Sequence, residues 1–281
     1  MSETDFAFCA RTLRRQDHDR YLTALFAPPD RRGGLFALYA FNQELARARE
    51  SVREPLMGLM RLQWWRDSLR DIDEGRPRAH AVIRPLAEAI AAYGLERAML
   101  KRLVDARERD MATEPPGDLA ALLDYADASS GTLALLALKV LGQPSPAVEE
   151  AGRDLGVAWA LAGIARAVPF HAAQRRLYLP ADLMANSGLS PGHLFERGTS
   201  LALRPVVEAL AEEARRRLAA VRQVRPQVPR RFHPVFLQAA LAAGHLRRLE
   251  AAGYDPFDVR VQQAPPGRIW GLAMLRLIGR Y

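Results

Sequence analysis

Two aspartates one helical turn apart form the clearest candidate for metal chemistry in this chain. Asp67 and Asp71 are spaced i, i+4, which places both carboxylates on the same face of a helix. Such a pair can hold a magnesium ion and a bound diphosphate, because magnesium prefers oxygen ligands. Arg66 and Arg70 lie beside the pair, and we favour the alternative interpretation of a solvent-exposed face closed by salt bridges.

Other residues that could do chemistry are scattered along the chain. The six histidines show no metal-ligand spacing, and we interpret most of them as surface residues or as core residues with satisfied hydrogen bonds. Cys9 is the single cysteine, which excludes a disulfide framework, and no neighbouring base would activate it as a nucleophile. Gly33 and Gly34 are not followed by the lysine of a phosphate-binding loop. These residues predict neither a metal site nor a nucleophile.

Composition and charge are those of a folded protein without a nucleic-acid partner. The chain has 281 residues, of which 49% are hydrophobic and 26% charged, and its formal net charge is +8. Nucleic-acid binding needs a basic patch on one face, whereas the arginines here are dispersed and most stand beside acidic residues. We therefore expect no nucleic-acid partner.

The sequence predicts a location inside the cell without a membrane span. The first ten residues contain Glu3 and Asp5 and no apolar run, so we expect no secretory signal. Apolar runs stay shorter than the ~18 residues that cross a bilayer. We expect a cytoplasmic protein that touches a membrane at most from its surface.

Helical spacing of apolar residues dominates the elements that must position any site. It is clear over Leu35–Leu45, Leu56–Leu69, Ala147–Val168 and Pro234–Ala251. Strand signals are nearly absent, and the breaks at proline and glycine are too short to link separate domains. We predict an all-α helical bundle in which residues 1–281 form one domain, with Asp118 and either Ser190 or Ser145 as helix N-caps.

Several ordered segments resemble the squalene/phytoene synthase family over roughly residues 8 to 260. The matching segments are Arg20–Leu22, Leu35–Phe41, Leu62–Asp67, Tyr125–Gly131, Leu155–Arg166 and Arg176–Pro180. The resemblance implies an isoprenoid-synthase-like bundle around a central apolar pocket. Enzymes of this family condense two prenyl diphosphates, with magnesium held by two aspartate-rich motifs on facing helices. We expect the helices that carry Tyr39–Glu50 and Ala158–His171 to face each other across the pocket.

The first aspartate-rich motif is degenerate in this chain. The family pattern D-D-x-x-D aligns with residues 46–50, so that Ala46 and Arg47 replace the two leading aspartates. Glu50 is the one position that keeps an oxygen ligand, and the family's upstream arginine falls on Gln43.

The second motif has lost its carboxylates as well. The family's Gln, Asn, first Asp, Glu and last Asp fall, in this order, on Ala160, Gly163, Ala167, Phe170 and His171. Arg166 is the one polar position of the motif that is kept.

Loss of five of the six expected carboxylates predicts a protein without the family's chemistry. Magnesium requires several oxygen ligands, so we expect no catalytic residue, no metal site and no cofactor. Magnesium would be required only if the chain were an active enzyme. By the resemblance, the residues lining the pocket are Tyr39, Gln43, Ala160, Gly163, Arg166 and Tyr178.

Three functions follow from the resemblance. One branch of the family resembles the mitochondrial assembly factor for respiratory complex I, and the L-Q-W-W-R-D segment after Glu54 and Pro55 fits that branch. The favoured hypothesis is a catalytically degenerate protein that assists complex I assembly through a protein client, peripherally at the inner membrane. The alternatives are an active prenyltransferase, and an isoprenoid- or lipid-binding protein that uses the pocket without chemistry. We expect at least one of Trp64 and Trp65 to pack in the core.

Overall fold

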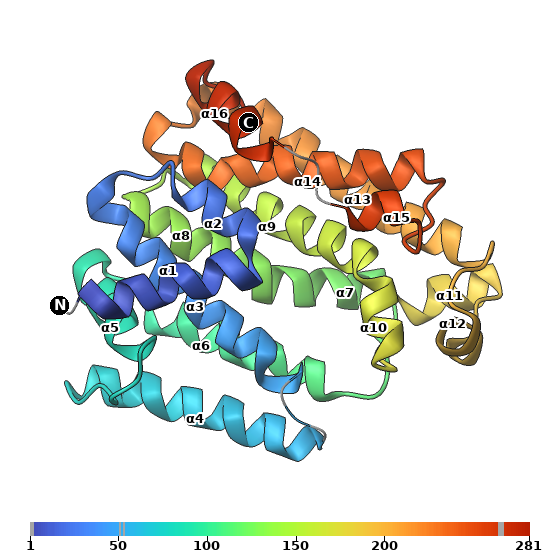
Figure 1. The fold of residues 1–281 in the computed structure, drawn as a ribbon, viewed down its shortest axis with the longest axis horizontal. Coiled ribbons are helices and arrows are strands. Elements are labelled where there is room, and N and C mark those ends of the chain that lie inside the picture. The colour runs from blue at the N-terminus through green and yellow to red at the C-terminus, as the bar shows by residue number, and fades with distance from the viewer. Residues whose placement is uncertain (1–2, 51, 53, 264–266) are drawn as a thin grey trace.

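Helices form the whole regular structure of the described chain. The computed structural model describes residues 3–50, 52, 54–263 and 267–281, and within these ranges it contains helices and no strand (Figure 1). The predicted all-α class is thereby confirmed. The first half comprises α1 Glu3–Gln16, α2 His18–Ala24, α3 Pro29–Glu50, α4 Pro55–Asp73, α5 Ile83–Tyr93, α6 Arg97–Ala106, η1 Arg107–Met111, α7 Leu119–Ala126, the π-helical turn η2 Asp127–Gly131 and α8 Thr132–Leu141. The second half comprises α9 Pro146–Arg166, α10 Val168–Ala173, α11 Ala181–Ser187, α12 Pro191–Arg197, α13 Leu203–Gln223, η3 Arg225–Gln227, η4 Arg230–Phe232, α14 His233–Ala251, α15 Val259–Gln262 and α16 Arg268–Leu277.

The long helices α3 and α9 lie at the centre of the bundle. Helix α3 packs on α1, α4, α5 and α8, and helix α9 packs on α8, α13, α14 and η2. Both therefore bury more than one face, which agrees with their long apolar stretches. Figure 1 shows α4 at one margin of the bundle and α16 at the opposite margin.

The predicted N-caps Asp118 and Ser190 are confirmed, whereas Ser145, the alternative, precedes α9 without a capping hydrogen bond from its side chain. The Asp118 carboxylate accepts a hydrogen bond from the backbone N–H of Ala121 at 2.8 Å, at the start of α7. The Ser190 hydroxyl accepts from the N–H of His193 at 3.2 Å, at the start of α12. Each side chain satisfies one of the amides that a helix start leaves without a partner.

One expected helix is wrong, because residues 158–171 are divided between two helices. Helix α9 ends at Arg166, and α10 begins at Val168 after Ala167, whose ψ of 4° is not helical. The cause is Pro169, which has no N–H to donate to the carbonyl four residues earlier and whose ring collides with that carbonyl. His171 consequently sits on α10 rather than on the central helix.

A continuous core joins the central helices to those around them. Its largest fully buried side chains include Trp65, Tyr39 and Phe236. Burial of Trp65 confirms the expected core role for one of the paired tryptophans, whereas Trp64 is half-buried beneath the guanidinium of Arg78. The single-domain organisation stays a prediction, which this core favours, and residues 1–2, 51, 53 and 264–266 of that range lie outside the described residues. In the part of the chain described here, no helix is both long and apolar enough to span a bilayer.

Candidate functional site

The paired aspartates of α4 are held by salt bridges. Asp67 Oδ1 accepts from Arg70 at 2.9 Å, and Asp71 Oδ2 accepts from Arg78 at 2.6 Å. The salt-bridged face is confirmed, including the pair of Asp67 with Arg70. The expected salt bridge of Arg66 to this pair is wrong. Arg66 pairs instead with Asp105 of α6 and Glu108 of η1.

The last two turns of α3 carry the positions aligned with the first aspartate-rich motif. Gln43 Nε2 donates to Asp17 Oδ2 at 3.1 Å, which ties this wall to the residue before α2. Ala46 is half-buried, whereas Arg47 and Glu50 are exposed. The one oxygen ligand of this wall therefore stands in solvent.

The second wall is made by the end of α9 and offers no oxygen ligand from a side chain at the aligned positions. Ala160, Gly163 and Ala167 are half-buried, and a Cβ added at Gly163 would meet nothing within 4 Å. Phe170, on α10, is 50% exposed. The surface of this wall is thus small and apolar where the family has amide and carboxylate side chains.

His171 packs as an aromatic residue. Its ring centroid lies 4.5 Å from that of Tyr178. Burial and the nearby charge of Arg176 lower the pKa of His171 to about 4, so the imidazole is neutral at pH 7.

A buried arginine lies between the two central helices. The guanidinium of Arg20, on α2, stands over the rings of Tyr39 on α3 and Trp159 on α9, at 5.7 Å and 5.4 Å from their centroids. It donates to Asp17 at 2.8 Å and to the Ser130 hydroxyl at 3.3 Å. The two helices therefore face the same space, but a cation that already has its counter-ion occupies it.

Tyr39 belongs to the packed core. Its hydroxyl accepts from Gln238 Nε2 at 3.2 Å, and burial raises its pKa to about 12. The side chain is 2% exposed.

Arg166, the retained polar residue of the second motif, joins a cluster of arginines around one carboxylate. Arg166 and Arg248 donate to His245 Nδ1 at 3.4 Å and 2.6 Å, and His245 Nε2 contacts Asp19 Oδ2 at 3.1 Å. Arg268, on α16, donates to the other oxygen of Asp19. Burial alone would raise the pKa of Asp19, but the hydrogen bond from His245 and the charge of Arg268 outweigh it and lower that pKa.

The cluster fixes the protonation state of His245. Its Nδ1 must accept, because arginine has no acceptor, and so Nε2 carries the proton that it donates to Asp19. Burial lowers the pKa of His245, and the hydrogen bond with Asp19 raises it. The charges of Arg166 and Arg248 lower it further, so the net effect is a lowered pKa. This residue fits the expectation of a core histidine with satisfied hydrogen bonds.

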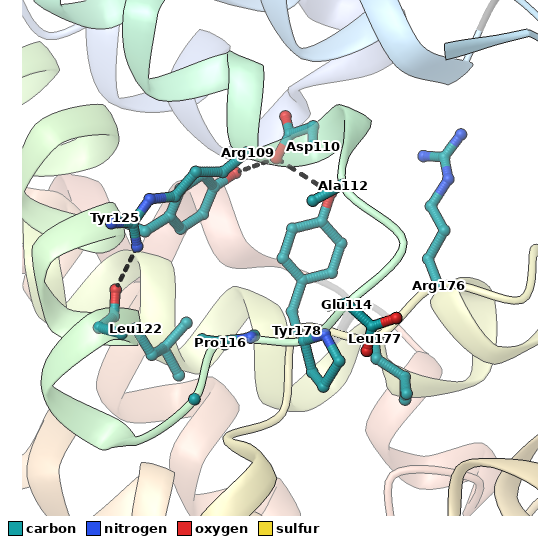
Figure 2. Close-up of a pocket in the computed structure, with 13 residues that line it drawn as sticks. Arg109, Asp110, Ala112, Glu114, Pro116, Leu122, Tyr125, Arg176, Leu177 and Tyr178 are labelled. Atoms are coloured by element: carbon teal, nitrogen blue, oxygen red, sulfur yellow. Dashed lines mark hydrogen bonds between the residues drawn. The ribbon is translucent and has the colours of Figure 1, made fainter.

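A cavity of about 370 Å³ opens between η1, α7 and the segment before α11 (Figure 2). Its lining residues are Arg109, Asp110, Ala112, Glu114, Pro115, Pro116, Gly117, Ala121, Leu122, Tyr125, Arg176, Leu177 and Tyr178. Of the six residues predicted to line a pocket, Tyr178 lines this cavity. Tyr39, Gln43, Ala160, Gly163 and Arg166 lie outside its lining, and for them the assigned role stays a prediction.

A buried carboxylate organises one side of the cavity, as Figure 2 shows. Asp110 Oδ1 accepts from the hydroxyls of Tyr125 at 2.8 Å and Tyr178 at 3.0 Å. Arg107 donates to Tyr125 at 2.9 Å and lies 3.4 Å from Asp110 Oδ2. Burial raises the pKa of both tyrosines, so each remains a donor at neutral pH. The network therefore presents to the cavity two tyrosine hydroxyls that already donate to Asp110.

The side chains at the two motif walls do not fit a magnesium cluster. The first wall offers Glu50, which is exposed, and the aligned positions of the second wall offer none. Within the described residues no group of three or more His, Cys, Asp and Glu could hold a metal ion. We therefore derive no catalytic step through magnesium at these walls.

Sequence reasoning missed most of the residues that organise these clusters. Asp19 lies more than two hundred positions before both His245 and Arg268, and the three residues share no local pattern. Asp110 and its partner Arg107 likewise gave no signal. Tyr125 belongs to the matched segment Tyr125–Gly131, and this match was the one signal in the sequence that pointed to the Asp110 network.

Known proteins of one family are similar to this chain over most of its length. The profile of the family described as squalene/phytoene synthase matches residues 13–268. The human NADH dehydrogenase (ubiquinone) complex I, assembly factor 6, is 30% identical over 256 residues, which is 91% of this chain and 77% of that protein. Presqualene diphosphate synthase of Rhodopseudomonas palustris is 27% identical over 212 residues, 75% of each chain.

The fold is also found among solved structures. A dehydrosqualene synthase crystallised with a ligand superposes with a TM-score of 0.85 at 20% identity, covering 98% of this chain and 96% of that one. This likeness shows the isoprenoid-synthase-like fold that the resemblance implied. The match over residues 13–268 and the similarity to the human relative show that the chain belongs to the squalene/phytoene synthase family.

Proposed function

We propose that this protein is a catalytically degenerate member of its family that assists the assembly of respiratory complex I. The observation that carries the proposal is the chemistry of the two walls, where one exposed carboxylate, Glu50, stands in place of six. Arg20, neutralised by Asp17, lies between the central helices. Similarity to the human complex I assembly factor over 91% of the chain supports the direction of the proposal.

The proposal includes a partner and a place. We propose a protein client linked to complex I and a peripheral position on the cytoplasmic side of the inner membrane. A factor that helps to assemble a membrane complex has to meet its client at that membrane. The named function of the human relative supports the link to complex I.

A deletion strain tests the assembly role against catalysis. We expect loss of the gene to lower NADH:quinone activity and to leave squalene and carotenoid levels unchanged. Complementation with the wild-type gene and with Glu50→Gln separates the two hypotheses. Glu50 is exposed, so the substitution leaves the fold intact while it removes the last aligned carboxylate. An assembly factor should be restored fully by Glu50→Gln.

The opposite pattern would reject the assembly role. Normal NADH:quinone activity with missing squalene or phytoene in the deletion strain would favour the active prenyltransferase. Turnover of farnesyl or geranylgeranyl diphosphate with magnesium by the purified protein, abolished by Glu50→Gln, would do the same.

A second candidate function is binding of an isoprenoid or another lipid without chemistry. The cavity near Tyr178 favours it, because Leu122, Leu177 and two prolines supply apolar surface beside the hydroxyls of the Asp110 network. Native mass spectrometry of the purified protein should then show a lipid adduct. Leu177→Trp, which narrows the cavity, should remove the adduct, and its persistence in that variant would place the lipid elsewhere.

A further inference from the structure

Helix α16 carries large apolar side chains on its outer face. Trp270, Met274 and Leu277 are 78%, 59% and 77% exposed, and Ile278 just beyond the helix is 54% exposed. Their spacing of four, seven and eight residues places them on one side of the helix. A surface helix usually turns its apolar side inward, so this face lacks a covering partner within the described residues.

The segment that carries this face has arginines and no acidic side chain, and two of these arginines pair with Asp258 and Asp19 outside it. Residues 259–281 contain Arg260, Arg268, Arg276 and Arg280 and no acidic residue. Over the whole chain acidic residues nearly balance the basic ones, 32 against 40, so this segment departs from the rest. An anionic partner therefore complements it better than a neutral or cationic one.

Two arginine-lined cavities share Arg247, and one of them borders α16. One, of about 220 Å³, lies between α14 and α16, and the other, of about 190 Å³, lies between α13 and α14. Their arginines are Arg247, Arg248 and Arg268 in the first, and Arg215, Arg222 and Arg247 in the second. Arg268 and Arg215 have ion-pair partners in Asp19 and Glu250. No carboxylate stands in either lining among the described residues, and the buried Nε of Arg248 lacks a hydrogen-bond partner.

We propose that α16 and these two cavities form a docking surface for an anionic lipid bilayer. The exposed face of α16 lies at the boundary between headgroups and acyl chains, with Trp270 at headgroup level. The arginines of the cavities receive the phosphates of anionic headgroups, which Arg binds with paired donors. This inference rests on the peripheral membrane position proposed above and names the surface that would hold it, and its failure would leave the complex I role untouched.

Vesicle sedimentation with the full-length protein tests the proposal. We expect binding to phosphatidylcholine vesicles that contain about 30 mol% phosphatidylglycerol, and weak binding to pure phosphatidylcholine. Replacing two exposed side chains in Met274→Ser/Leu277→Ser should weaken binding about 10-fold, because the inserted apolar surface is lost. Added salt should weaken binding of the wild type, since headgroup attraction is screened. Trp270 fluorescence should shift to the blue on binding, and Trp270→Phe should remove that shift.

The chain offers a matched control on the opposite margin of the bundle. Met60 and Leu56 of α4 are 59% and 67% exposed, so Leu56→Ser/Met60→Ser removes a similar apolar area. This control should bind vesicles as the wild type does. Equal weakening by both double variants, no wild-type binding to anionic vesicles, or equal binding to neutral ones would overturn the proposal. So would a change in self-association by the α16 variant without an effect on vesicles, which would mark the face as a protein interface.

Discussion

Asp17 and Asp19 act as internal counter-ions for arginines near the motif walls. Asp17 pairs with Arg20, and Asp19 pairs with Arg268 while it accepts a hydrogen bond from His245. A site built to bind diphosphates has to keep positive charge available for its ligand. Here these two carboxylates already neutralise part of that charge. The arrangement is consistent with the proposed loss of prenyl diphosphate chemistry.

The first prediction concerns the pH dependence contributed by His171. Its folded pKa of about 4 lies below the unfolded value of about 6.5. The folded state therefore loses stability as pH falls from 6.5 towards 4, by about 3 kcal/mol in total, because the unfolded chain binds the proton more readily. His171→Phe should remove this part of the acid destabilisation in urea unfolding followed across that range.

At pH 8 the two proteins should differ little in their pH slope, since the histidine is neutral in both states there. Parallel curves for wild type and His171→Phe between pH 6.5 and pH 4 would contradict the assignment.

The second prediction concerns the carboxylate beside the cavity. Asp110→Ala leaves the guanidinium of Arg107 buried without its counter-charge and two tyrosine hydroxyls without their acceptor. We expect the free energy of unfolding to fall by about 3–5 kcal/mol. Tyr178→Phe removes one donor and keeps the ion pair, so it should cost about 1 kcal/mol. Denaturant titrations that gave the two variants equal losses would show that the ion pair contributes nothing.

At the scale of elements, periodicity predicted the central helices because their apolar residues repeat without a break. It also ended one helix at Val168, close to the observed end of α9 at Arg166, whereas the family motif predicted a helix that continues through Pro169 to His171. The family motif is one uninterrupted helix, but in this chain the proline breaks it between α9 and α10. Periodicity also cannot tell which face of α16 meets the bundle, because Leu272 and Leu275 are as apolar as Trp270 and Leu277.

The third prediction compares two glycines of α9. A Cβ at Gly156 would lie 2.4 Å from the Ser130 carbonyl and 2.6 Å from the Gly131 Cα, both backbone atoms of η2. Gly156→Ala should therefore destabilise by about 1–3 kcal/mol, because α9 and η2 must separate. Gly163→Ala adds its methyl to open space and should stabilise by about 0.5–1 kcal/mol through helix propensity. Chemical unfolding of both variants measures the contrast, and a stabilising Gly156→Ala would refute the close packing.

At the scale of the whole molecule, the matched segments predicted the fold because they recur in a fixed order along most of the chain. The same segments could not predict what lies between the walls. His245 and Asp19 are 226 positions apart, and Arg268 and Asp19 are 249 positions apart, so only the folded chain brings them together. The carboxylate losses were visible position by position, whereas the ion pairs of Asp17 and Asp19 with arginines near those positions were not.

The last prediction concerns ligand-induced stabilisation of the whole protein. A ligand that binds only the native state, at 100 times its Kd, adds about 2.7 kcal/mol of stability. For a chain of this size that corresponds to a rise in Tm of about 5–10 °C. With one exposed carboxylate at the motif walls, magnesium and farnesyl diphosphate should leave the Tm of this protein unchanged. The presqualene diphosphate synthase of Rhodopseudomonas palustris, measured in parallel, supplies the comparison. A magnesium-dependent rise in Tm, abolished by Glu50→Gln, would show that the site still binds diphosphate through the metal.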